Sequence, residues 1–174
     1  TGNVDLSVAE GTQWAVVDSV VLADTVIYPF AGSKFLSTMD SAAYQSDSYS
    51  FWTAPRQLNL SSYNTASIKM HAWTDAESCC DEVSVMLKSA SDSTGDWTVL
   101  GEITGRNLDS GWEDYSFSLN FLDLELSNDM QLALLFESDG SVQYTGIAID
   151  QVLLDGADVF AAAPPVNLMA TDFE

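Results

Sequence analysis

The chain has few basic side chains. Five lysines and arginines stand against 26 aspartates and glutamates in 174 residues, which gives a formal net charge of -21. A surface this negative repels the phosphates of nucleic acids and of anionic lipid headgroups. We therefore expect neither a nucleic-acid partner nor membrane insertion. The acidic excess suits a calcium-rich extracellular medium, a saline habitat or a need for solubility, because cations screen carboxylates in the first two.

Long apolar runs are missing as well. No stretch approaches the roughly 20 residues that a membrane-spanning helix requires. The chain opens on Thr1, Gly2 and Asn3 without the basic segment of a signal peptide, so we expect a mature or excised part of a secreted protein. A hydrophobic share of 47% is enough for a folded core, and 174 residues suit one domain.

Cysteine and histidine are scarce. Cys79 and Cys80 are the only cysteines and they are adjacent, so they cannot make the long-range crosslink of small secreted domains. They can form a vicinal disulfide or stay reduced, depending on the compartment. His71 is the only histidine, which argues against a zinc site and against a serine hydrolase. We therefore predict that the protein is not an enzyme.

What the sequence does contain is a series of short runs in which apolar and polar residues alternate, the pattern of strands with one buried face. In the third run, Ile68, Met70 and Ala72 alternate with Lys69 and His71. Turn-forming residues separate the runs. We predict an all-β fold, a two-sheet antiparallel β-sandwich (jelly roll). The eight clearest strands are expected at residues 14–22, 48–53, 66–73, 83–89, 97–103, 112–119, 130–137 and 146–154.

Residues 1–160 are expected to form this single sandwich domain. The segment 161–174 is expected to be a linker or tail, because Pro164 and Pro165 cannot lie in a central strand. It could also open a following domain or donate a strand to a neighbouring molecule. Large rings in strands usually fill the space between sheets, and we expect this burial for most of the four strand tryptophans, Trp52, Trp73, Trp97 and Trp112.

Four segments of the second half occur in a characteristic order. They are 96–100 (DWTVL), 111–119 (GWEDYSFSL), 134–141 (LLFESDGS) and 146–152 (GIAIDQV). Together they resemble the MAM-like jelly-roll modules, which include the choice-of-anchor type of bacterial repeats and the domains appended to immune-inhibitor-type secreted metalloproteases. One departure is that Gln151 follows Asp150 where the family has a second aspartate; its amide oxygen is still one that calcium accepts.

The resemblance implies an extracellular, frequently calcium-stabilised module used in adhesion or as an accessory domain, without catalysis. It also implies acidic residues in one inter-strand loop and on the last strand. The segment 75–82 holds four carboxylates in eight residues, and they repel one another unless a cation or water separates them. We predict a calcium site formed by Asp75, Glu77, Asp81 and Asp150. The alternative is an acidic loop that only faces water.

Aromatic rings near loops and strand ends could stack on a sugar, or simply pack at the rim of the core. These ligand-binding candidates are Tyr44, Tyr49, Tyr63 and Tyr144. The sequence thus predicts a non-catalytic extracellular binding or adhesion module, stabilised by calcium, whose partner is a glycan or an extracellular protein. One alternative is a structural subunit of an extracellular filament or surface layer that binds neighbouring copies of itself. A weaker alternative is a glycoside hydrolase or lyase, which needs a pair of carboxylates.

Overall fold

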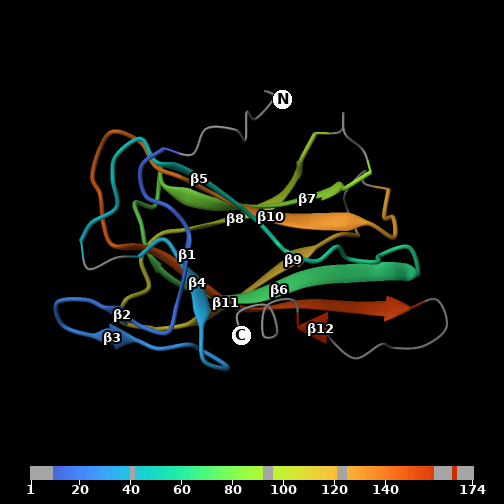
Figure 1. Cartoon of the computed structure of the whole chain (residues 1–174), viewed down its shortest axis with the longest axis horizontal. Coiled ribbons are helices and arrows are strands. Elements are labelled where there is room, and N and C mark those ends of the chain that lie inside the picture. Colours follow the sequence, from blue (N-terminus) through green and yellow to red (C-terminus); the bar gives the residue numbers. More distant parts are fainter. Residues whose placement is uncertain (1–9, 40–41, 92–95, 121–124, 159–165, 168–174) are drawn as a thin grey trace.

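The computed structural model describes residues 10–39, 42–91, 96–120, 125–158 and 166–167. The regular elements of these residues are all β-strands, and every strand pairing is antiparallel. Figure 1 shows two layers, with β5, β7, β8 and β10 above β6, β9 and β11. The predicted all-β sandwich is confirmed. No helix of this part of the chain is long and apolar enough to cross a membrane.

The larger sheet is built around two long central strands that pair with each other. It consists of β1 (Ala15–Val17), β4 (Phe35–Ser37), β11 (Gly146–Asp158), β6 (Tyr63–Asp75) and β9 (Glu113–Ser118) in that order, with β12 (Val166–Asn167) also paired to β11. The register between β11 and β6 shifts after Asp150, where Gln151 has a positive φ of 48°. Such a bulge redirects the strand locally.

The smaller sheet consists of β5 (Tyr49–Thr53), β10 (Met130–Glu137), β7 (Glu82–Ser89) and β8 (Thr98–Thr104) in that order. A separate two-stranded hairpin is formed by β2 (Val20–Val21) and β3 (Val26–Ile27). The main core lies between the two large sheets. As the alternation predicts, Ile68, Met70 and Ala72 face this core, where they are at most 2% exposed.

A second apolar cluster lies on the outer face of the larger sheet, against the β2–β3 hairpin. Val20 and Ile27 of the hairpin are buried there against Phe35 and Ala148. The first expected strand is therefore interrupted at Asp18, and the residues that follow form the hairpin that covers this face. The prediction of one continuous strand at 14–22 is wrong, because β1 ends at Val17 and β2 begins at Val20.

The tryptophans divide between the two sides of the sheets. Trp52 packs against the main core as expected. Trp73 and Trp112 pack in the outer cluster of the larger sheet, and Trp97 packs with Phe51 against the outer face of the smaller sheet. The prediction that most of the four fill the space between the sheets is therefore wrong, because three of them pack in the outer clusters instead.

The predicted tail 161–174 lies outside the described residues except for Val166 and Asn167. These two residues pair with Leu154 and Leu153 of β11 in the same chain. They extend the larger sheet along a part of β11 that follows Ala148 and Ile149, the two residues of β11 that pair with β4.

Candidate functional site

Three loops meet at one end of the sandwich, and we call this region the loop end. They are the β6–β7 loop (76–81), the β8–β9 loop (105–112) and the β10–β11 loop (138–145). The N–H of Ala76 donates to the carbonyl oxygen of Gly105 at 3.0 Å, and the N–H of Asp139 donates to the Asp81 carboxylate at 2.8 Å. Residues far apart in sequence are thus fixed close together.

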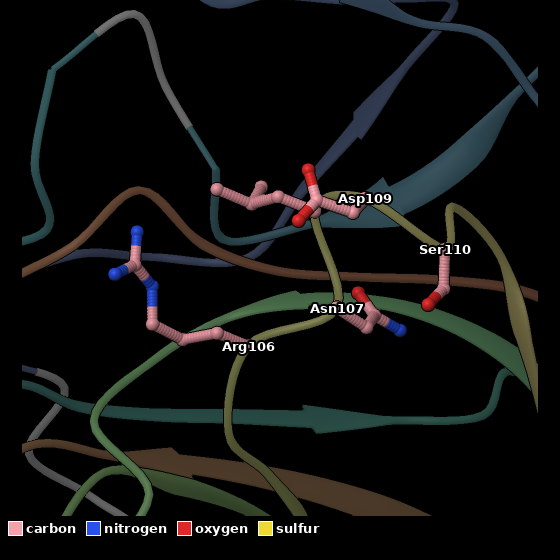
Figure 2. A pocket seen from close by; sticks show the side chains of 5 residues that line it. Arg106, Asn107, Asp109 and Ser110 are labelled. Carbon is pink, nitrogen blue, oxygen red and sulfur yellow. The ribbon is translucent and has the colours of Figure 1, made fainter.

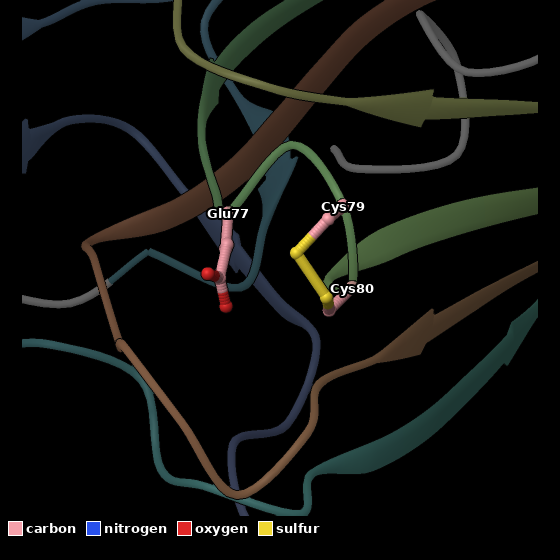
Figure 3. A group of neighbouring side chains, drawn as sticks. All are labelled: Glu77, Cys79 and Cys80. Carbon is pink, nitrogen blue, oxygen red and sulfur yellow. A yellow bond between two sulfur atoms is a disulfide. The ribbon is translucent and has the colours of Figure 1, made fainter.

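The β6–β7 loop is a tight turn closed at Glu77. The N–H groups of Cys80 and Asp81 both point to the Glu77 carbonyl oxygen, at 3.4 and 3.2 Å. Figure 3 shows the Glu77 side chain beside the disulfide that joins Cys79 to Cys80. Of the two states that the sequence left open, the structure contains the oxidised one, and both cysteines are exposed.

Asp81 is the buried centre of the loop end. Its side chain is fully buried, at 0% exposure. One carboxylate oxygen accepts the N–H of Asp139, and the other accepts a short hydrogen bond from the Tyr44 hydroxyl. Burial and this hydrogen bond raise the pKa of Tyr44, so Tyr44 stays a neutral donor. The Tyr44 hydroxyl and the Asp139 N–H are the two donors that the described residues supply to the Asp81 carboxylate, and a buried carboxylate with two donors still has lone pairs available to a cation.

Glu77 and Asp139 bring two more carboxylates to Asp81. Each of the three residues offers an oxygen, and these oxygens all lie within 4.8 Å of one another. Asp139 accepts hydrogen bonds from the N–H and the hydroxyl of Ser141, which lower its pKa. No ion pair between described residues involves any of the three carboxylates. We call Glu77, Asp81 and Asp139 the carboxylate cluster.

Asp75, which the sequence placed in the metal site, has other partners. It is 3% exposed, and one oxygen accepts Arg106 Nε at 2.6 Å. The other oxygen accepts both the N–H of Thr145 at 3.1 Å and its hydroxyl at 2.6 Å. Arg106 also lies over the ring of Tyr144, 4.1 Å from its centroid. Asp75 thus holds the β8–β9 and β10–β11 loops to the end of β6.

Asp150, the fourth predicted ligand, does not join the carboxylate cluster. It lies on the outer face of the larger sheet, paired in register with His71, whereas Asp75 pairs with Gly146 four residues away along β11. Its oxygens accept the N–H groups of Ala31 at 2.9 Å and Gln151 at 2.6 Å. Burial raises its pKa in spite of these bonds.

The four candidate tyrosines lie in different surroundings. Tyr44 is buried, at 4% exposure, and is a structural donor to Asp81. Tyr49 is half-buried beside the outer cluster of the smaller sheet, and Tyr63 packs against the main core. Tyr144 is half-buried under Arg106 at the loop end. The structure therefore does not bring them together into one surface.

A shallow pocket of about 310 Å³ opens on the β8–β9 loop next to Arg106. It is lined by residues 106–110, and Figure 2 shows Arg106, Asn107, Asp109 and Ser110 around it. Asn107 is buried, and its polar side-chain atoms have partners there. The side chain accepts a hydrogen bond from the N–H of Thr74 at 2.6 Å and donates one to the carbonyl oxygen of Ala72 at 3.3 Å. Asn107 therefore ties the loop that lines the pocket to the backbone of β6.

Sequence reasoning missed Asp139 and Arg106. Asp139 stands in the segment Ser138–Asp139–Gly140–Ser141, which has the composition of a turn, and nothing in its spacing relates it to Asp81, 58 residues away. Arg106 is one of only five basic residues in the chain. Because basic residues are so scarce in this chain, the sequence could have predicted that Arg106 pairs with a buried carboxylate.

Comparisons with known proteins give likenesses of fold. No family model and no curated protein matches the chain. The K2 cleaved adhesin domain of Lys-gingipain is similar with a TM-score of 0.48 and 14% identity, over 82% of this chain and 83% of that chain. The CBM22-1 xylan-binding domain of Xyn10C from Paenibacillus barcinonensis is similar with a TM-score of 0.38 and 16% identity, over 89% of this chain and 92% of that chain. Both TM-scores are below 0.5, so neither likeness indicates a function for this chain.

Proposed function

We propose that this chain is a non-catalytic binding module of an extracellular protein, and that a calcium ion stabilises its loop end. The observation that carries the proposal is the carboxylate cluster, in which three acidic side chains approach within 4.8 Å around the buried Asp81. Carboxylates this close repel one another, so a cation between them lowers the free energy of the fold. The resemblance of the second half to MAM-like modules points in the same direction.

The donor set fits calcium better than other metals. Glu77, Asp81 and Asp139 offer only oxygen atoms, which hard cations prefer, and calcium takes six to eight of them in a flexible geometry. Magnesium demands a near-ideal octahedron and keeps more of its water. Soft metals would need thiolates, but Cys79 and Cys80 are bonded to each other. Calcium would neutralise charge, while the protein residues hold the three loops in place.

The surroundings of His71 support a role without catalysis. This is the only histidine in the chain. Phe30 stacks on its ring at 3.5 Å between centroids, and Asp114 lies 2.7 Å from its Nδ1. No hydroxyl or thiol of the described residues donates a hydrogen bond to it, so the nucleophile of a hydrolase is not in place there.

We propose a glycan or an extracellular protein as the ligand. The test is a glycan array together with a pull-down from extracellular protein fractions, each performed in calcium and in EDTA. We expect binding in calcium and weaker binding in EDTA, because release of the ion loosens the three loops. Asp139→Asn should lose this difference, and Asp24→Asn, an exposed aspartate of the β2–β3 turn, should keep it. Absence of binding in both screens would contradict the proposed function.

A further inference from the structure

Tyr28 and Phe30 are large rings that the fold leaves in solvent. Tyr28 directly follows β3 and Phe30 comes two residues later, and their exposed fractions are 65% and 46%. A buried aromatic side chain removes about 150–250 Å² from water, so folding gains little from rings left outside. Exposed apolar groups that occur together on a surface mark contact sites.

Phe30 presents one open face to solvent. Its other face lies on the His71 ring, with 3.5 Å between centroids and an angle of 17° between the planes. His71 stands on the outer face of the larger sheet, in register with Asp114 of β9 and Asp150 of β11. Since the stacked face is covered, the exposed part of Phe30 is the face that points away from the sheet.

The segment that carries the two rings is held in place before any ligand arrives. The N–H of Ala31 donates to the Asp150 carboxylate at 2.9 Å, and the Trp112 indole N–H donates to the Tyr28 carbonyl oxygen at 3.0 Å. Trp112 also meets the Phe30 ring edge-on, with 6.5 Å between centroids. A surface that is already ordered loses little entropy on binding.

The rim of this surface can accept hydrogen bonds from hydroxyl groups. The Asp114 side chain is 87% exposed, and one of its oxygens lies 2.7 Å from His71 Nδ1 without hydrogen-bond alignment. Its lone pairs are therefore available to a ligand. With Asp114 at the rim and a net charge of -21 on the chain, an anionic ligand would be repelled.

We infer that Tyr28, Phe30 and Asp114 form a binding platform for a neutral saccharide. A sugar ring has a face of polarised C–H bonds, which the negative face of an aromatic ring attracts. The hydroxyls at its edge can donate hydrogen bonds to a carboxylate. The inference rests on the proposed function of a binding module and adds the ligand class and its place.

The test is isothermal titration of the calcium-loaded protein with cellohexaose, mannohexaose and xylohexaose. Phe30→Leu keeps an apolar side chain but removes the ring, and Tyr28→Ala removes the second ring. The matched control is Val99→Ala, which removes part of an exposed apolar side chain on β8 of the smaller sheet. Thermal melts of each variant establish that it is folded. We expect one of the three hexaoses to bind, with binding at least about tenfold weaker in Phe30→Leu and in Tyr28→Ala, and unchanged in Val99→Ala.

Each other outcome overturns the inference in a distinct way. A hexaose that binds wild type and Phe30→Leu equally would remove the platform but leave the proposed function standing. If no hexaose binds wild type, the ligand class is wrong, and the pull-down from extracellular proteins then decides the proposed function separately. Binding of a tetralysine peptide that depends on Phe30, without binding of any hexaose, would make the platform a site for cationic peptides.

Discussion

Removing the Arg106 side chain should destabilise the loop end, because Arg106 neutralises a buried carboxylate. Asp75 has a side chain that is 4% exposed, and Arg106 Nε lies 2.6 Å from one of its oxygens. In Arg106→Ala this charge stays buried, with only the two hydrogen bonds from Thr145 to stabilise it. The stacking of Arg106 on Tyr144 is lost as well.

The magnitude follows from how buried the pair is. Breaking a fully buried ion pair costs about 3–5 kcal/mol. Arg106 is 49% exposed, so water screens the interaction, and the Thr145 bonds remain; we expect about 1–2 kcal/mol for Arg106→Ala. Asp75→Ala leaves Arg106 and both Thr145 donors without their acceptor, and we expect about 3 kcal/mol. For a chain of this length, 1 kcal/mol corresponds to about 2–4 °C in Tm.

Urea and thermal unfolding, followed by circular dichroism, measure both variants. Lys34→Ala, at an exposed position, is the charge-matched control and should change stability by less than about 0.5 kcal/mol. An Arg106→Ala protein as stable as wild type would refute the argument. Asp75→Asn should keep any response of Tm to calcium, because Asp75 is occupied by Arg106 and Thr145. Loss of that response would indicate instead that Asp75 is a ligand of the metal site.

Three further outcomes are expected. Asp81→Asn and Asp139→Asn should each abolish a calcium-specific rise in Tm, which ligand linkage predicts for a native-state site; a rise that survives both changes would exclude the carboxylate cluster. Thiol titration of native protein should find no free thiol, and replacing Cys79 and Cys80 together by serine should lower Tm by less than about 3 °C, because so short a ring constrains the unfolded chain little. Hydrogen bonds from neighbouring serines lower the pKa of Asp129, so its contribution to stability is present above the ordinary aspartate pKa and is lost as pH falls through the lowered one. Asp129→Ala should therefore destabilise the protein in urea at pH 7 but less at pH 3, and an equal effect at both would contradict this.

The alternation of apolar residues was enough to predict the sandwich, because it reports which side chains share a face of a strand. It does not report which face is covered. On β6, Ile68 and Met70 face the main core. Trp73 lies on the opposite face, and this face is also covered, because Trp73 packs in the outer cluster with the β2–β3 hairpin. The misplacement of the tryptophans therefore comes from assuming that only one face of each sheet is buried.

The candidate site was predictable only where its residues are close in sequence. Glu77 and Asp81 belong to one acidic loop, and the sequence drew attention to both. Asp139 comes from another loop, and Asp75 is diverted from the cluster by Arg106. Both facts depend on tertiary pairing between strands, which local patterns do not encode. Asp150 was chosen through the family resemblance, and the β6–β11 register places it on the outer face of the sheet.

The most direct test of the account is a calcium titration by calorimetry of EDTA-stripped protein, with magnesium and Asp81→Asn as controls. We predict one calcium ion bound per chain, weaker or absent binding of magnesium, and loss of calcium binding in Asp81→Asn with the fold retained. Absence of calcium binding to the wild-type chain, or equal binding to Asp81→Asn, would contradict the claim that the carboxylate cluster holds the ion at the loop end.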